Sequence, residues 1–101
     1  MTTDAPTPRI AILGAGLIGA AWAALFQHHG ADVRVWDPHS DALAATPTRM
    51  TKPLAQLVEV VPDAGPRGTL TLCDTLAEAV DGADLVQENA PENIPVKHDL
   101  Y

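Results

Sequence analysis

Short apolar runs alternate with longer segments of helical pattern along this chain of 101 residues. The run around Val33 and Val35 shows the strand pattern most clearly, because these two residues flank the charged Arg34 and so share one face. Apolar runs of this kind predict four strands, over residues 9–13, 32–36, 70–73 and 84–87.

The segment after the first strand predicts an amphipathic helix from Leu17 to about His29. Its apolar positions recur at intervals of three and four residues, and Gly30 follows as a C-terminal cap. His28 and His29 fall in the last turn, where the helix dipole favours positive charge, so we expect both side chains on the surface.

Prolines are expected to divide the region between the second and third strands. Ser40 or Asp41 caps a helix that Pro47 interrupts early, and a further helical segment begins near Pro53 and ends near Val61. A loop rich in proline and glycine then leads to the third strand. Asp74 or Thr75 is expected to cap a short helix over residues 76–80, and a last helix is expected to begin near Ile94.

This alternation of strands and helices is typical of a parallel sheet that is covered by helices on both faces. Right-handed crossovers then give the spatial strand order 3-2-1-4. We therefore predict an α/β fold, a Rossmann-type doubly wound parallel sheet truncated after its fourth strand. Residues 1–8 are expected to form a flexible lead and residues 9–101 an incomplete domain of this fold.

Composition narrows the classes of partner and compartment. The chain is 47% hydrophobic and its formal net charge of −7 argues against nucleic acid and anionic membrane surfaces as partners. Residues 1–9 lack the apolar core of a signal peptide, and no stretch reaches the ~20 apolar residues of a transmembrane helix. Cys73 is the single cysteine and is expected to be a small buried hydrophobe in a cytoplasmic protein.

A Gly-x-Gly-x-x-Gly motif follows the first predicted strand directly. Gly14 permits the tight turn, Gly16 lets the pyrophosphate of a dinucleotide approach the backbone, and Gly19 allows close packing of helix on strand. The helix that begins near Leu17 directs its unpaired N–H groups and its positive dipole end toward that pyrophosphate. In this context the motif predicts a dinucleotide site.

Asp37 ends the second predicted strand, 18 residues after Gly19. An acidic residue at this distance accepts hydrogen bonds from the ribose hydroxyls of the adenosine. A carboxylate also repels a 2′-phosphate, and neither Pro38 nor His39 is an arginine that would bind one, so the sequence favours NAD over NADP. The alternative is a turn that needs glycine for steric reasons alone, with Asp37 as a solvated strand end.

Three stretches together resemble the N-terminal NAD-binding domain of the 3-hydroxyacyl-CoA dehydrogenase family. They are residues 10–19, residues 35–38, and the end of the chain, where residues 76–80 and 83–93 are followed by Lys97. The fourth strand followed by Pro-Glu and then by a lysine is the most specific of these features. The resemblance covers roughly residues 9–101 and is weakest over residues 42–69.

The resemblance implies a cofactor site at matched positions. Asp37 would lie at the adenosine end of NAD, and Glu92 and Lys97 would lie near the ribose of the nicotinamide. The remaining cofactor-binding residues implied are those of the glycine motif, namely Gly14, Ala15, Gly16, Leu17, Ile18 and Gly19. The alternatives are that Glu92 is an acid at a helix start, interacting with the dipole, and that Lys97 is a solvated helix lysine.

Within the family, the chain resembles the branch of carnitine dehydrogenase and gulonate dehydrogenase (lambda-crystallin) more than the acyl-CoA enzymes. Residues 19–23, 87–88 and 90–92 carry this likeness. The acyl-CoA enzymes have a long helical arm after the second strand, whereas here that region is expected to be short and broken by prolines. The resemblance therefore favours a small hydroxy acid as substrate over an acyl-CoA, in carnitine or fatty acid metabolism.

The family transfers a hydride between a secondary alcohol and NAD, with a histidine as general base that is polarised by glutamate and assisted by serine and asparagine. None of the four histidines of this chain stands in the matching context, so we predict no catalytic residue and no metal ligand in it. The complete enzyme is expected to be a homodimer with a helical C-terminal domain. The alternatives are a stand-alone nucleotide-binding module completed by a partner chain and a structural homologue without turnover.

Overall fold

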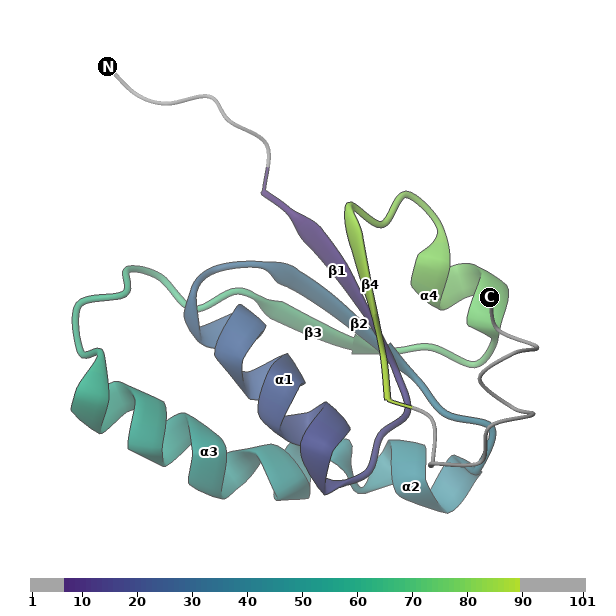
Figure 1. Ribbon diagram of the computed structural model, residues 1–101, viewed down its shortest axis with the longest axis horizontal. Helices are drawn as coiled ribbons and strands as arrows, with labels where there is room; N and C mark the ends of the chain where they lie inside the picture. The colour runs from purple at the N-terminus through teal and green to yellow at the C-terminus, as the bar shows by residue number, and fades with distance from the viewer. Residues whose placement is uncertain (1–6, 90–101) are drawn as a thin grey trace.

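Four parallel strands form the sheet of the computed structural model, which describes residues 7–89. Their spatial order is β3-β2-β1-β4, as the sequence predicted (Figure 1). The predicted boundaries differ by one residue at the third and fourth strands. The strands are β1 (Arg9–Leu13), β2 (Asp32–Trp36), β3 (Thr69–Leu72) and β4 (Leu85–Glu88).

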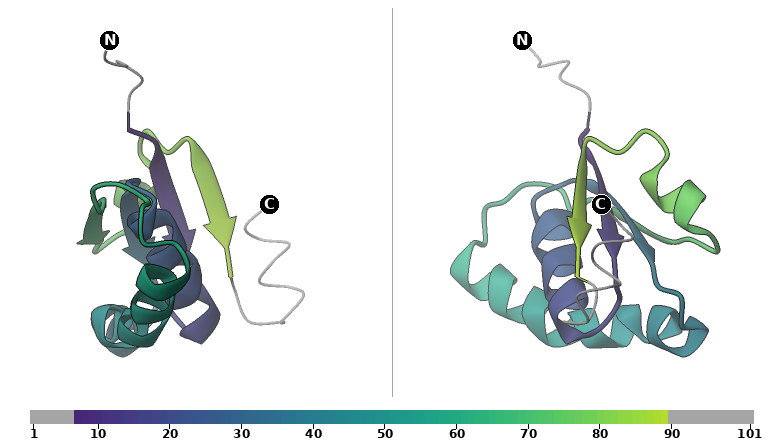
Figure 2. Two further views of the ribbon diagram at one scale, coloured as in Figure 1. Left: turned by 90° about the vertical axis from the view of Figure 1, so that its left-hand side faces the viewer. Right: turned by 45° about the vertical axis from the view of Figure 1, so that its right-hand side comes forward.

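Helices cover both faces of this sheet, so the fold is doubly wound. The helices are α1 (Leu17–His28), α2 (Ser40–Ala44), α3 (Thr46–Val60) and α4 (Leu76–Val80). Figure 2 shows α1 and α3 on one side of the strands and α4 on the other. Among residues 7–89, no helix has the length and apolar character that crossing a membrane requires.

Alternating side chains of the strands fill two separate cores. Toward α1 and α3, the buried side chains of Ile12 and Val35 pack in one cluster with Met50 of α3. Burial of each such side chain contributes about 1.5–3 kcal/mol. Toward α4, Leu13 packs in a second cluster with Cys73 and Ala79. Cys73 is buried as expected, and its burial raises the pKa of the thiol, so little reactive thiolate is present at neutral pH.

Between β2 and β3, the second helix starts earlier than the sequence predicted. The helix expected from Ser40 does end before Pro47, at Ala44, but the next helix begins at Thr46 instead of near Pro53, which gives the continuous helix α3 of 15 residues. Pro47 lies in the first turn, where its missing N–H has no intrahelical partner to lose. Pro53 lies inside the helix and offers no N–H to the carbonyl of Arg49. The buried side chain of Met50 holds this helix on the core despite that loss.

His28 is a second correction. Its side chain is only 7% exposed, and its Nε2 lies 2.7 Å from the carbonyl oxygen of Val61, just beyond α3. The expected surface position is therefore wrong for His28, because a polar partner far along the chain compensates its burial. His29 is exposed as expected, with Nδ1 2.9 Å from the carbonyl oxygen of Leu25.

The helix ends follow the sequence in part. Gly30 comes directly after the C-cap of α1 and donates to the carbonyl of Gln27, so the expected C-terminal cap is confirmed. Thr75 rather than Asp74 caps α4, because its Oγ1 accepts from the backbone N–H of Glu78 at 3.1 Å. Neither of the residues expected to cap α2 does so, since its N-cap is His39.

Strand β4 forms one edge of the described sheet and presents apolar side chains there. Leu85 and Val86 are 46% and 45% exposed. An exposed apolar edge favours pairing with another chain, and lysine on an edge strand opposes it. We expect this chain to associate as its concentration rises, and Val86→Lys to remain monomeric, when both are measured by sedimentation velocity.

The matched control for this experiment is Val58→Lys, because Val58 is 46% exposed but lies on α3, away from the strand edge. This substitution adds the same charge without altering β4, so it should leave the association in place. A chain that stays monomeric at every concentration contradicts the prediction.

Candidate functional site

The glycine loop (residues 14–19) joins β1 to α1 in a turn that depends on two of its glycines. Gly14 has a φ of +104°, and its N–H donates to the carbonyl of Trp36 at 2.8 Å. A Cβ on Gly19 would lie 1.8 Å from the carbonyl oxygen of Gly14. The turn expected at Gly14 and the close packing expected at Gly19 are therefore confirmed.

Gly16 has no steric reason of this kind to be glycine. It is the N-cap of α1 with a φ of −71°, and a Cβ built on it would meet no atom within 4 Å. The backbone here borders open space at the N-terminus of a helix of 12 residues, where N–H groups and the dipole favour an anion. The purely steric interpretation of the motif does not explain Gly16.

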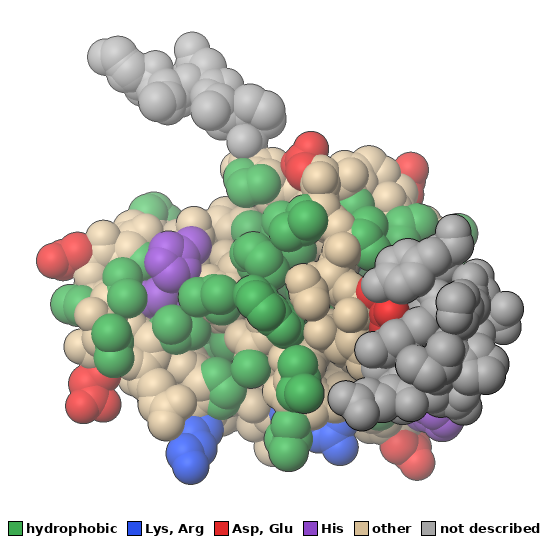
Figure 3. Space-filling view, in the orientation of Figure 1, with side chains coloured by type: hydrophobic (Ala, Val, Ile, Leu, Met, Phe, Trp, Pro, Cys, Tyr) green, Lys and Arg blue, Asp and Glu red, His purple; other side chains and the backbone are tan. Residues whose placement is uncertain are grey.

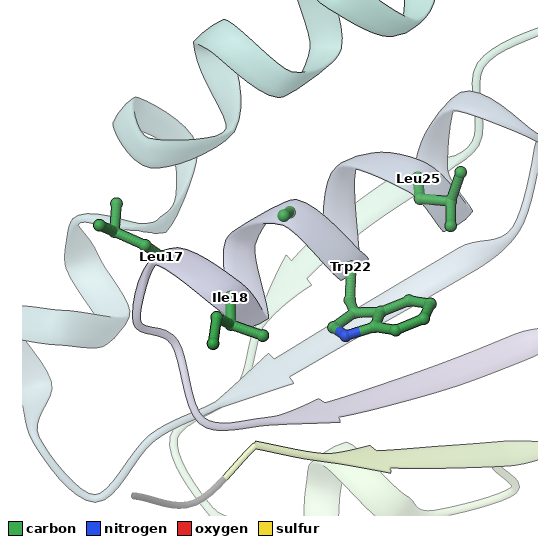
Figure 4. A pocket seen from close by; sticks show the side chains of 5 residues that line it. Leu17, Ile18, Trp22 and Leu25 are labelled. Atoms are coloured by element: carbon green, nitrogen blue, oxygen red, sulfur yellow. The ribbon is translucent and has the colours of Figure 1, made fainter.

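Leu17 and Ile18 occupy the first turn of α1 and are 75% and 70% exposed. Together with three residues further along the helix they line an open apolar groove, namely Ala21, Trp22 and Leu25 (Figure 4). Apolar side chains also gather over this helix in the space-filling view (Figure 3). Within the glycine loop, the side chains of Leu17 and Ile18 therefore face solvent rather than the core.

Asp37 reaches back from the end of β2 to the glycine loop. Its Oδ2 accepts from the N–H of Ala15 at 2.7 Å, and its Oδ1 accepts from the N–H of His39 at 2.7 Å. The side chain of Asp37 is only 10% exposed, so the alternative of a solvated strand end is wrong. The Nδ1 of His39 also lies 3.2 Å from this Oδ1. Because a carboxylate has about four acceptor positions, Asp37 keeps capacity for a further donor such as a hydroxyl group.

Sequence reasoning missed Arg49. The Nη1 of this residue donates to the carbonyl oxygen of Ala15 at 2.9 Å, so α3 contacts the glycine loop directly. The expected break at Pro47 hid this contact, because only a helix that begins at Thr46 and continues past Pro47 places Arg49 opposite the loop. Recognising Pro47 as a first-turn residue was the signal available in the sequence.

The end of β4 meets the glycine loop from the other side. The N–H of Asn89 donates to the carbonyl of Leu13 at 2.8 Å, and the carbonyl oxygen of Asn89 would lie 3.0 Å from a Cβ on Gly14. The loop therefore lies at the carboxyl ends of β1 and β4, where the order β3-β2-β1-β4 places the change of crossover direction. Open α/β sheets bind ligands at this point.

Two of the predicted site residues, Glu92 and Lys97, lie outside the described residues. The other predicted positions come together in one place, the glycine loop with Asp37 against it. Within residues 7–89, no group of three or more His, Cys, Asp or Glu side chains is arranged to hold a metal ion.

These features fit an NAD molecule. The open space at Gly16 suits a pyrophosphate at the positive end of α1, and the carboxylate of Asp37 has acceptor positions for ribose hydroxyls. Residues 9–101 match the model of the NAD-binding domain of 3-hydroxyacyl-CoA dehydrogenase. The chain belongs to this family.

The 3-hydroxyacyl-CoA dehydrogenase family includes curated relatives that act on carnitine. The chain is 41% identical over 100 residues to an L-carnitine dehydrogenase of Nocardiopsis dassonvillei, covering 98% of this chain and 30% of that protein. It is 39% identical over 90 residues to an L-carnitine dehydrogenase/betainyl-CoA thioesterase of Rhizobium meliloti, covering 88% of this chain and 18% of that protein. The chain thus spans less than a third of the length of these relatives.

Solved structures of the same kind share the fold. An NAD⁺-dependent dismutase, 5-formyl-3-hydroxy-2-methylpyridine 4-carboxylic acid 5-dehydrogenase, matches with a TM-score of 0.81 and 33% identity over 95% of this chain and 32% of that chain. A diketoreductase matches with a TM-score of 0.80 and 32% identity over 96% of this chain and 36% of that chain. The chain is thus the NAD-binding domain of an oxidoreductase family.

Proposed function

We propose that this chain is the cofactor-binding part of an oxidoreductase that transfers a hydride between a 3-hydroxy acid or 3-hydroxyacyl-CoA and NAD. The observation that carries the proposal is the pairing of Asp37 with the N–H of Ala15 beside the open backbone of Gly16. When bound, NAD accepts or supplies the hydride. The residues of this chain bind and orient it.

Each part of the dinucleotide has its own residues in this proposal. The pyrophosphate binds at the glycine loop, against Gly14, Ala15, Gly16, Leu17, Ile18 and Gly19, and the adenosine ribose donates to Asp37. Glu92 and Lys97 contact the ribose of the nicotinamide. In this role the carboxylate of Asp37 both accepts from the ribose hydroxyls and repels a 2′-phosphate.

For the substrate, we propose a small hydroxy acid of the carnitine type. The relatives of 41% and 39% identity support this choice, since both carry L-carnitine dehydrogenase in their names. The argument from a broken helical arm does not support it, because α3 is continuous over 15 residues. An acyl-CoA substrate, and with it fatty acid metabolism, is the less supported alternative.

The proposal extends to the organisation of the whole protein. Residues 1–8 form a lead and residues 9–101 the NAD-binding domain, and a helical C-terminal domain supplies the general base and the contacts of a cytoplasmic homodimer. The two L-carnitine dehydrogenase relatives, of which this chain covers 30% and 18%, are long enough to hold such a domain. This chain by itself is expected to bind NAD without turnover, and to bind neither nucleic acid nor membranes.

Thermal unfolding with and without NAD tests the proposal, with NADP as the control. A ligand at ten times its dissociation constant adds about 1.4 kcal/mol to stability, which raises the Tm of a domain of this size by roughly 6–11 °C. We expect that rise with NAD and none with NADP. A cooperative unfolding transition whose Tm does not change with NAD contradicts the proposal.

A further inference from the structure

Arg49 and Asp37 form hydrogen bonds with the two backbone groups of Ala15 in the glycine loop. Asp37 accepts from the N–H of Ala15 at 2.7 Å, and Arg49 donates to the carbonyl of Ala15 at 2.9 Å. One charged group therefore fixes the peptide before Ala15 and an opposite charge fixes the peptide after it. Arg49 comes from α3, whose neighbouring residue Met50 is buried in the core.

Because peptide units are planar and trans, these two contacts determine which way the N–H of Gly16 points. The carbonyl and the N–H of one peptide unit point to opposite sides. The unit between Gly14 and Ala15 illustrates this, since its N–H points to Asp37 while its carbonyl oxygen lies against Gly19. In the next unit, Arg49 fixes the carbonyl of Ala15, so the N–H of Gly16 is directed away from α3.

The charge of Arg49 also matters locally. The chain has 6 lysines and arginines against 13 acidic residues, and Asp37 places a carboxylate on the loop that is expected to receive a pyrophosphate. A guanidinium held 2.9 Å from the same loop opposes the repulsion between that carboxylate and the phosphates. Arginine suits this position, because its planar group keeps its charge and its remaining donors while one N–H is engaged.

We propose that Arg49 is a positioning residue of the cofactor site, which fixes the peptide between Ala15 and Gly16 so that the N–H of Gly16 faces the pyrophosphate. This inference rests on the proposed binding of NAD. It assigns a role in recognition to α3, and it predicts that loss of Arg49 weakens ligands with a pyrophosphate more than ligands without one.

The test compares Arg49→Met, Arg49→Gln and Arg49→Lys with the unaltered chain. Calorimetric titration with NAD, ADP-ribose and adenosine measures affinity, and the ¹⁵N–¹H signal of Gly16 reports the hydrogen bond to the ligand. For Arg49→Met we expect NAD and ADP-ribose to bind about tenfold more weakly, the factor that corresponds to 1.4 kcal/mol. Adenosine should change less than about twofold, since the adenosine end lies on Asp37.

Arg49→Lys tests whether Arg49 positions the cofactor-binding peptide or only stabilises the fold. Arg49→Lys keeps a charged donor and should recover most of the affinity for NAD, together with the shift of the Gly16 signal. Lys52→Met is the matched control, because Lys52 is exposed on the same helix and its loss removes a charge without touching the loop. It should bind NAD like the unaltered chain.

The outcomes distinguish the two proposals. If the unaltered chain melts cooperatively and does not bind NAD, the proposed function fails and the role of Arg49 fails with it. If the unaltered chain binds NAD and Arg49→Met binds it equally well, or if all three ligands weaken by the same factor, only the positioning role is overturned. Should Arg49→Met not fold, Arg49→Gln decides: glutamine lacks the charge and is shorter, so NAD and ADP-ribose should again weaken selectively, and binding equal to that of the unaltered chain overturns the positioning role.

Discussion

Gly19→Ala is expected to lower the free energy of unfolding by about 3 kcal/mol or more. The added Cβ would lie 1.8 Å from the carbonyl oxygen of Gly14 and 2.9 Å from its carbonyl carbon. These atoms belong to the backbone of the turn, so relief requires α1 to move away from β1. Since small domains are stable by about 5–15 kcal/mol, the substitution removes a large share of the total, which urea denaturation measures.

Gly16→Ala is the matched control for this experiment. Gly16 has a φ of −71°, which alanine adopts readily, and a Cβ there would meet no atom within 4 Å. Its stability should stay within about 0.5 kcal/mol of the unaltered chain, while the methyl group enters the space assigned to the pyrophosphate. Gly19→Ala is thus expected to affect mainly stability, and Gly16→Ala mainly the binding of the dinucleotide. A Gly19→Ala protein as stable as Gly16→Ala contradicts the argument.

Asp37→Asn is expected to weaken the binding of NAD about tenfold to a hundredfold. Hydrogen bonds to a charged group contribute about 1.5–3 kcal/mol. The substitution replaces the charged carboxylate, to which the ribose hydroxyls are proposed to donate, by a neutral amide. The amide has a single acceptor oxygen, which cannot replace both carboxylate oxygens that accept from Ala15 and His39. We therefore also expect a loss of about 1 kcal/mol of stability without ligand.

Binding of NADP gives this prediction its sharpest measurement. The carboxylate of Asp37 repels a 2′-phosphate, so Asp37→Asn should lower the ratio of NAD affinity to NADP affinity, measured by calorimetric titration. Asp41→Asn is the control, because Asp41 is an exposed acid on the neighbouring helix α2. If Asp37→Asn leaves the ratio of NAD affinity to NADP affinity unchanged, Asp37 does not determine the choice of cofactor.

The sequence was sufficient for the sheet and for the glycine loop, because both depend on local patterns. Strand alternation fixes which side chains are buried, and the spacing from Gly14 to Gly19 fixes the turn, so the order β3-β2-β1-β4 followed from general crossover rules. The partnership of Asp37 with the loop was also foreseeable, although its hydrogen bond to Ala15 was not.

Features that depend on tertiary packing were not predictable in this way. The partners of His28 and Arg49 lie 33 and 34 residues away along the chain, beyond any local pattern. Pro53 disfavours a helix by itself, and only the packing of α3 on the core outweighs its missing N–H. The same misjudged helix accounts for the missed role of Arg49, because the two errors concern one segment.

The central place of β1 in the sheet has a consequence for synthesis on the ribosome. Its register pairs Ile10 with Val33 on one side and with Leu85 on the other, so one neighbour is made early and the other late. At about 5–20 residues per second, Leu85 follows Ile10 by roughly 4–15 s. During that interval β1 presents an unpaired edge to solvent. The carboxyl end of the sheet, where the glycine loop lies, is complete only when β4 has been made.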